Sequence, residues 1–169
     1  MWEHGEFRLG YAYNQGEGGL AKNWALAKEW YEKAAAQGHA VAMNNLGYLY
    51  DEGGHGLTQN HVTAVKWFRK GAEAGYNGAQ CALGTYYLEG WGGLAKNLVQ
   101  ARSWYQKSAN QGHTNAQCAL GIMMVQGQGG AMDLNAGRAL WQRAAAAGNK
   151  QAQTNLDKLH SFLASDEFD

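Results

Sequence analysis

The sequence contains no proline and only two cysteines among its 169 residues. Without proline, the chain must make its turns with other residues, and its 24 glycines are the natural candidates. The absence of proline also fits a chain that is mostly helix. Two cysteines are too few for the disulfide framework that supports many small secreted domains. With 46% apolar residues, the chain is instead expected to fold around an ordinary hydrophobic core.

The sequence also lacks net charge, because 14 basic residues balance 14 acidic ones. The overall charge therefore gives no reason to expect nucleic acid or an anionic membrane as a partner. No segment approaches the roughly 18 consecutive apolar residues of a membrane span, and the N-terminus has no basic segment followed by an apolar one. We expect no membrane span and no signal peptide in this chain, while its compartment stays open.

Residue patterns typical of catalytic and metal sites are missing as well. None of the six histidines pairs with another ligand at metal-binding spacing on one helix face, and His55 and His61, which flank one loop, are too few for a metal site. The glycine-rich segments follow no predicted strand and precede no Gly-Lys-Ser or Gly-Lys-Thr. Asp51 and Glu52 are adjacent and point in different directions on a helix. The sequence therefore predicts no catalytic residue, no metal and no cofactor.

What the sequence does contain is a repeat of 37 residues. A Leu-Gly pair recurs at that interval, at Leu9-Gly10, Leu46-Gly47, Leu83-Gly84 and Leu120-Gly121. A second set follows it, in which the last copy comes one residue early: Trp30-Tyr31, Trp67-Phe68, Trp104-Tyr105 and Leu140-Trp141. Each repeat therefore contains two different segments.

Both segments have the spacing of a helix. In the first, helix A, Ala79, Leu83 and Tyr87 lie on one face, and the glycine of the Leu-Gly pair is expected to allow close packing of helices. A glycine-rich loop then ends at a good N-cap residue, namely Asn23, Asn60, Asn97 or Asp133. The second segment, helix B, ends at a glycine suited to a left-handed stop, namely Gly38, Gly75, Gly112 or Gly148.

These boundaries predict an all-α protein of stacked helical hairpins. We expect one repeat domain over residues 1–163, with repeats at about 3–39, 40–76, 77–113 and 114–149. A single hairpin cannot bury its apolar face, but a stack of at least three can, and the end units then need polar outer surfaces. Residues 150–163 are predicted to form a lone capping helix, in which Asp157 replaces the packing glycine, and residues 164–169 a tail.

The repeated pattern resembles the Sel-1-like repeat family, which is related to tetratricopeptide repeats. Repeat two carries the motif at Ala42, Leu46, Gly47, Tyr50, Gly53, Asn60, Ala64, Trp67, Phe68, Ala72 and Gly75. The resemblance implies a right-handed α/α superhelix, a solenoid that assembles other proteins, and in bacteria often a periplasmic or secreted location. One branch of the family has paired cysteines in each repeat and is linked to weak binding or hydrolysis of β-lactams. Cys81 and Cys118 have no second cysteine in their repeats, and we expect free thiols.

The candidate partner-binding surface lies on helix A, opposite its core leucine. With 100° per residue, three positions per repeat fall on that side, and they vary between repeats. They are Phe7, Tyr11 and Asn14; Asn44, Tyr48 and Asp51; Cys81, Thr85 and Leu88; and Cys118, Ile122 and Val125. The resemblance places helix A on the concave side, where these residues form either a groove for a peptide or partner helix, or contacts buried by tight curvature or by the preceding helix B.

One loop residue joins this set, because Trp91 stands where the other repeats have Glu17, Gly54 and Gln128. The leading hypothesis is a non-enzymatic scaffold that binds a protein or peptide on the helix-A face. The alternative is a binder of a small cell-wall-type ligand, a β-lactam or a peptidoglycan fragment, with at most weak hydrolase activity. A third hypothesis is self-association through the N-terminal repeat.

Overall fold

The computed structural model describes residues 3–165, with the side chains of residues 5–162, and these residues form nine α-helices. The helices are α1 (Glu3–Gln15), α2 (Trp24–Ala36), α3 (Ala40–Glu52), α4 (His61–Glu73), α5 (Asn77–Glu89), α6 (Leu98–Asn110), α7 (Thr114–Val125), α8 (Leu134–Ala146) and α9 (Lys150–Ser165). The predicted all-α class, with a helix A and a helix B in each of four repeats and one further helix, is confirmed. No helix in the described part of the chain has the length and apolar character needed to span a bilayer.

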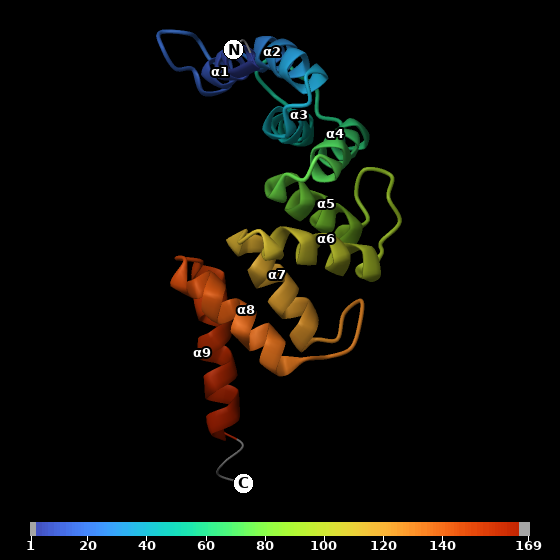
Figure 1. Cartoon of the computed structure of the whole chain (residues 1–169), viewed down its shortest axis with the longest axis vertical. Coiled ribbons are helices and arrows are strands. Elements are labelled where there is room, and N and C mark those ends of the chain that lie inside the picture. Colours follow the sequence, from blue (N-terminus) through green and yellow to red (C-terminus); the bar gives the residue numbers. More distant parts are fainter. Residues whose placement is uncertain (1–2, 166–169) are drawn as a thin grey trace. The chain divides into compact units, whose positions relative to one another are not determined.

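The helices group into two compact units that divide between Lys96 and Asn97. In the first unit, α2 packs against α1 and α3, while α4 packs against α3 and α5 (Figure 1). In the second unit, α7 packs against α6 and α8, and α9 packs against α8. The prediction of a single domain stays a prediction. The predicted capping helix is present as α9, but it runs to Ser165, so the predicted tail begins too early, and residues 166–169 lie outside the described residues.

Local side-chain bonds explain where the helices begin. The predicted N-caps of the B helices are confirmed, because Asn23, Asn60, Asn97 and Asp133 each accept a hydrogen bond from the backbone N–H three residues later, at 2.9–3.1 Å. Two A helices are capped by histidine, since His39 Nδ1 accepts from Ala42 N and His113 Nδ1 accepts from Ala116 N. These bonds need a lone pair on Nδ1, and burial lowers the pKa of His113, which favours that neutral ring.

Glycines on helix A pack against an aromatic ring from helix B of the same repeat. A Cβ added at Gly10 would lie 2.6 Å from the Tyr31 ring, and one added at Gly121 would lie 2.5 Å from Trp141 Nε1. Gly47 meets Phe68 in the same way. The predicted packing glycines are confirmed at these three positions, where the two helices approach too closely for a side chain.

The core leucines of helix A pack against the preceding helix B. Leu46 on α3 is fully buried in a cluster with Tyr31, Ala34 and other residues of α2. Leu9, the equivalent residue of α1, is 40% exposed, because no described helix precedes α1. Each repeat therefore buries its helix A only when a neighbouring repeat supplies the other half of the contact.

Candidate functional site

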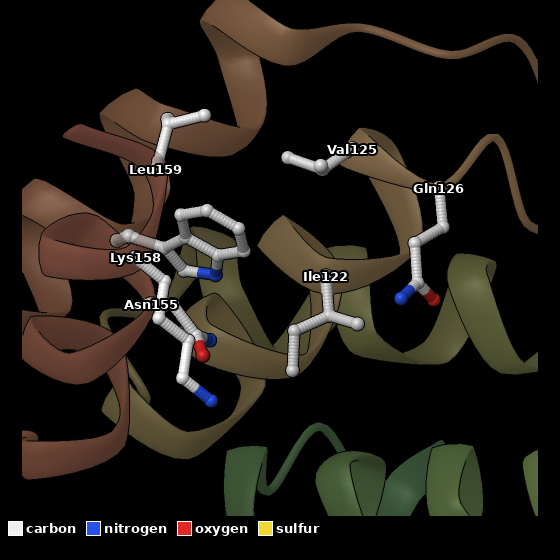
Figure 2. Close-up of a pocket in the computed structure, with 7 residues that line it drawn as sticks. Ile122, Val125, Gln126, Asn155, Lys158 and Leu159 are labelled. Carbon is white, nitrogen blue, oxygen red and sulfur yellow. The ribbon is translucent and has the colours of Figure 1, made fainter. Parts of the chain in front are cut away.

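A pocket of about 350 Å³ lies in the second unit, where α7, α8 and α9 meet. We call it the α7–α9 pocket, and its lining residues are Ile122, Val125, Gln126, Trp141, Asn155, Lys158 and Leu159. Figure 2 shows Ile122, Val125 and Gln126 on one side and Asn155, Lys158 and Leu159 on the other. Two residues of the predicted helix-A surface, Ile122 and Val125, are thus brought together with side chains of the capping helix.

Trp141 forms a fixed wall of this pocket. Its side chain is only 6% exposed, and its Nε1 donates a hydrogen bond to the backbone oxygen of Cys118 at 3.1 Å. The same edge of the indole lies against Gly121, about one turn further along α7. Because the ring is packed and its one polar atom is bonded, the wall exists before any ligand binds.

The pocket combines apolar walls with a polar edge. Ile122, Val125 and Leu159 are partly buried and pack against the cluster that contains Trp141. Gln126 and Lys158 are exposed, and Lys158 is the one charged residue of the lining. Such a site suits an apolar group with a hydrogen-bond acceptor or a carboxylate beside it, and its volume is typical of ligand pockets.

Two residues of the candidate helix-A surface are buried. Asn44 is 5% exposed in α3, where its backbone lies near Gly71 of α4, and Cys118 is 5% exposed in α7. Cys118 packs in one cluster with residues of α8 and α9. For these two side chains the buried alternative therefore applies, although the contacts come from helices that follow helix A in the chain rather than from the preceding helix B.

The other predicted positions keep some exposure, and several share hollows. Phe7 and Tyr11 line a hollow of about 370 Å³ on α1, while Asn14 and Tyr48 line one of about 290 Å³ beside α3. Tyr11 and Tyr48 are 41% and 43% exposed. The remaining four, Asp51, Cys81, Thr85 and Leu88, are partly buried.

Asp51 belongs to a hydrogen-bonded network that links three helices. Its Oδ1 accepts a bond from the Tyr86 hydroxyl of α5 and lies 2.8 Å from His61 Nδ1 at the start of α4. Since a carboxylate only accepts, the ring nitrogen that faces it carries the hydrogen. Burial and the bond to Asp51 raise the pKa of Tyr86, so the hydroxyl remains the donor.

Trp91, the singled-out loop residue, lies beside this network and is 49% exposed. Its ring centroid is 5.9 Å from that of Tyr86 and 6.4 Å from that of His61. Together with Gly90 and Gly92, His61 and Trp91 line an open hollow of about 440 Å³.

Sequence reasoning missed His61 and Tyr86, although the repeat carries a signal for both. In register, His61 stands where other repeats have Trp24 and Leu98, and Tyr86 stands where they have Ala12, Leu49 and Met123. The α9 residues of the pocket were also missed, because the capping helix was regarded only as a cover for the core. A comparison of every position across the four repeats would have found the first two.

The two cysteines are free, and both thiols are protected. Burial raises the pKa of Cys81 to about 12 and also raises the pKa of Cys118. Since the thiolate is the reactive form, both should react with a chromogenic disulfide at pH 8 at least about tenfold more slowly in the native chain than in urea. Native thiols that react as fast as the unfolded ones would contradict this expectation.

Comparison with known proteins agrees with this architecture. The model of the Sel1 repeat matches residues 4–39, 40–76, 78–113 and 114–149, and these limits differ from the predicted ones by at most one residue. No curated protein sequence matches the chain. The matched repeats cover α1 to α8 and leave α9 as the additional helix.

Solved structures show the same fold. The chain is 35% identical to a protective antigen of uropathogenic Escherichia coli with an SLR fold, with a TM-score of 0.86 over 95% of this chain and 34% of that one. It is 37% identical to a Sel1 repeat protein from Oxalobacter formigenes, with a TM-score of 0.83 over 91% of this chain and 60% of that one. Cysteine rich protein B of Helicobacter pylori is 19% identical, with a TM-score of 0.59 over 76% of this chain and 96% of that one.

The chain thus spans about a third of the first of these relatives and 60% of the second. Four consecutive matches to one repeat model, together covering most of the sequence, settle the classification. The protein belongs to the Sel1 repeat family.

Proposed function

We propose that the protein is a non-enzymatic scaffold that binds a partner polypeptide, and that the α7–α9 pocket receives an apolar side chain of that partner. The observation that carries this proposal is the composition of the pocket. Ile122 occupies the register position of Tyr11, Tyr48 and Thr85, so an apolar residue replaces a polar one where the surface is hollowed. Sel1 repeats are typical of protein-binding scaffolds, which supports a polypeptide as the ligand.

The geometry suits an anchoring residue of a peptide. An apolar side chain that enters the pocket contacts Ile122, Val125 and Leu159 and is removed from water. Buried anchors of this kind carry most of the binding energy at interfaces. Lys158 and Gln126 at the edge can bond the main chain or a carboxylate of the same peptide. Because the Trp141 wall is already fixed, little ordering is needed on binding.

The test is to select binding peptides from a random displayed library and to measure their affinity for three proteins. These are the wild-type chain, Ile122→Glu, and Tyr48→Glu, which changes the same register position in repeat two. Ile122→Glu should weaken binding at least about tenfold, since it places a carboxylate in an apolar pocket, whereas Tyr48→Glu should leave it within about twofold.

Equal affinity of all three proteins for the selected peptides would remove the α7–α9 pocket as the contact. The alternative ligand, a β-lactam or a peptidoglycan fragment, stays a prediction. If this alternative is right, a β-lactam or a peptidoglycan fragment raises the midpoint of thermal unfolding of the wild type, and the displayed peptides do not. Self-association through the N-terminal repeat also stays a prediction, and the exposed Leu9 and Tyr11 are the residues that it would cover.

A further inference from the structure

Trp91 differs from the other tryptophans whose side chains the structure describes. Four of those rings lie under a lysine of the same chain: Lys22 over Trp24, Lys33 over Trp30, Lys70 over Trp67 and Lys107 over Trp104, at 4.0–5.1 Å from the ring centroid. A fifth, Trp141, is buried and hydrogen-bonded. Trp91 is 49% exposed, and no lysine or arginine of the described residues lies over its ring.

The residues that hold Trp91 are departures from the repeat. Asp51, His61, Tyr86 and Trp91 each replace a different residue type in the other repeats, and in the structure all four meet at one place. A stack of Sel1 repeats does not need this network, since apolar residues fill most of the same positions elsewhere. Four such departures in contact with one another indicate a site.

The network also fixes what the site presents to a ligand. Asp51 receives the hydrogen of His61 Nδ1, so in the neutral ring Nε2 is a hydrogen-bond acceptor, and the His61 side chain is 45% exposed. Both bonds to Asp51 go to Oδ1, and its side chain keeps 25% exposure. The hollow beside Trp91 is lined by Gly90 and Gly92, which have no side chains to fill it.

Acidic residues stand at two helix ends near Trp91. Asp51 and Glu52 end α3, and Glu89 ends α5 two residues before Trp91. Basic residues are also close, namely Lys96 in the same loop and Lys66, Arg69 and Lys70, which line a hollow with Gly92. The carbonyl ends of α3 and α5 add partial negative charge, whereas the N–H end of α4, which begins at His61, adds partial positive charge. The choice of a cation therefore rests on the exposed indole face and the Asp51 carboxylate.

We propose that Trp91 and His61 form a second binding site, which takes an arginine side chain of a partner polypeptide. A guanidinium group is planar, so it can lie on the exposed indole face while its N–H groups donate to His61 Nε2 and toward Asp51. An ammonium group has the charge but not the plane, and an aromatic side chain has the plane but not the donors. That the arginine belongs to a polypeptide rests on the proposed function.

The probe for the test is a tripeptide with blocked ends, acetyl-Gly-Arg-Gly-amide, and the readout is the indole N–H signal of Trp91 in proton–nitrogen correlation spectra at pH 8. The peptide should shift this signal in a saturable way. The lysine tripeptide should bind at least about threefold more weakly, and the uncharged citrulline tripeptide more weakly still. Citrulline binding as tight as arginine binding would overturn the role of the charge, and equal binding of lysine would overturn the choice of arginine.

Three variants locate the contact. Because Trp91→Ala has no indole signal of its own at this site, binding to the variants is followed through the backbone N–H signals of Gly90 and Gly92, which line the same hollow. Trp91→Ala should weaken binding about two- to fivefold, and Trp30→Ala, a matched control whose ring already lies under Lys33, should leave it unchanged. His61→Phe keeps a ring but removes the acceptor, and it should abolish the preference for arginine over lysine. An equal loss in Trp91→Ala and Trp30→Ala, or an unchanged preference in His61→Phe, would overturn the proposed site.

Ile122→Glu separates this site from the α7–α9 pocket. It should bind the arginine tripeptide as the wild type does, even where it has lost the selected peptides. No shift of the Trp91 signal, while selected peptides still bind in the manner expected for the pocket, would refute only the arginine site. If the arginine tripeptide shifts the Trp91 signal but the selected peptides bind Ile122→Glu as tightly as the wild type, only the pocket is refuted.

Discussion

Gly129→Ala is expected to lower the free energy of unfolding by about 1–3 kcal/mol more than Gly18→Ala does. The two glycines occupy the same register position, in repeats four and one, and their φ angles are nearly equal at 68° and 66°. An alanine pays the cost of a left-handed conformation at both positions, about 1–2 kcal/mol. Only at Gly129 does the new Cβ also collide with backbone, namely the carbonyl group of Leu98.

The collision cannot be relieved by a side-chain rotation. Leu98 is the first residue of α6, the helix B of the preceding repeat, so the loop of repeat four rests on the start of that helix. Gly92 rests on His61 in the same way, with 2.5 Å between a built Cβ and the carbonyl oxygen. A Cβ built at Gly18 has no atom of the described residues within 4 Å, its two chain neighbours aside. The difference between the variants therefore measures the docking of a loop on the preceding repeat.

Urea unfolding, monitored by circular dichroism, gives the free energy of unfolding of Gly129→Ala and of Gly18→Ala. Amide hydrogen exchange at the start of α6 shows whether the loss of stability in Gly129→Ala is local. Gly92→Ala is expected to behave like Gly129→Ala. If all three variants lost the same free energy, backbone strain alone would account for the effect. The loops would then be free of the preceding helices in solution.

His55 shows how one repeat accommodates a side chain at this register position. It has a φ of 47°, and the loop around it pairs Gly54 with Leu57 as an isolated bridge. Its ring lies 5.1 Å from that of Trp24, the first residue of α2. The loop of repeat two therefore reaches the same place, the start of the preceding helix B, with a different backbone.

Much of the fold could be predicted because its signals are local. Asn23 and its equivalents mark where helix B begins, and Gly38 and its equivalents mark where it ends, so the helix limits follow from residues within one turn. The Gly47 contact with Phe68 could be expected because glycine recurs inside a helix, where it is otherwise unfavourable. These features depend on spacing alone.

The candidate sites were less predictable because they depend on packing between repeats. A helical wheel places Asn44 and Cys118 opposite the core leucine but cannot say whether that side is exposed, and in the structure both side chains are buried. The bond from Tyr86 to Asp51 joins residues 35 positions apart, and no spacing rule predicts it. Likewise, only the position of α9 on α8 brings Lys158 to the pocket.

Trp141→Ala is expected to have the largest effect on stability, a loss of about 3–5 kcal/mol. The indole is 6% exposed, fills the space that Gly121 leaves on α7, and belongs to one cluster with Cys118, Ala144 and Leu156. Removing it leaves a cavity between three helices and takes one of the hydrogen-bond donors away from the Cys118 carbonyl. Chemical unfolding of the second unit, followed by circular dichroism, measures the loss.

Two further variants distinguish packing from hydrogen bonding. Trp141→Phe restores the ring found at Phe68 in repeat two and removes the Nε1 donor, so it should cost about 1–2 kcal/mol, mostly for the bond to Cys118 and a smaller volume. Trp104→Ala removes a partly buried ring of the same unit that lies under Lys107, and it should cost about 1 kcal/mol. A loss in Trp104→Ala as large as in Trp141→Ala would mean that any tryptophan of the unit supports the fold. We expect the loss of unfolding free energy to be largest in Trp141→Ala, smaller in Trp141→Phe and smallest in Trp104→Ala. This order would show that the contact between Trp141 and Gly121, which also forms the wall of the pocket, stabilises the second unit.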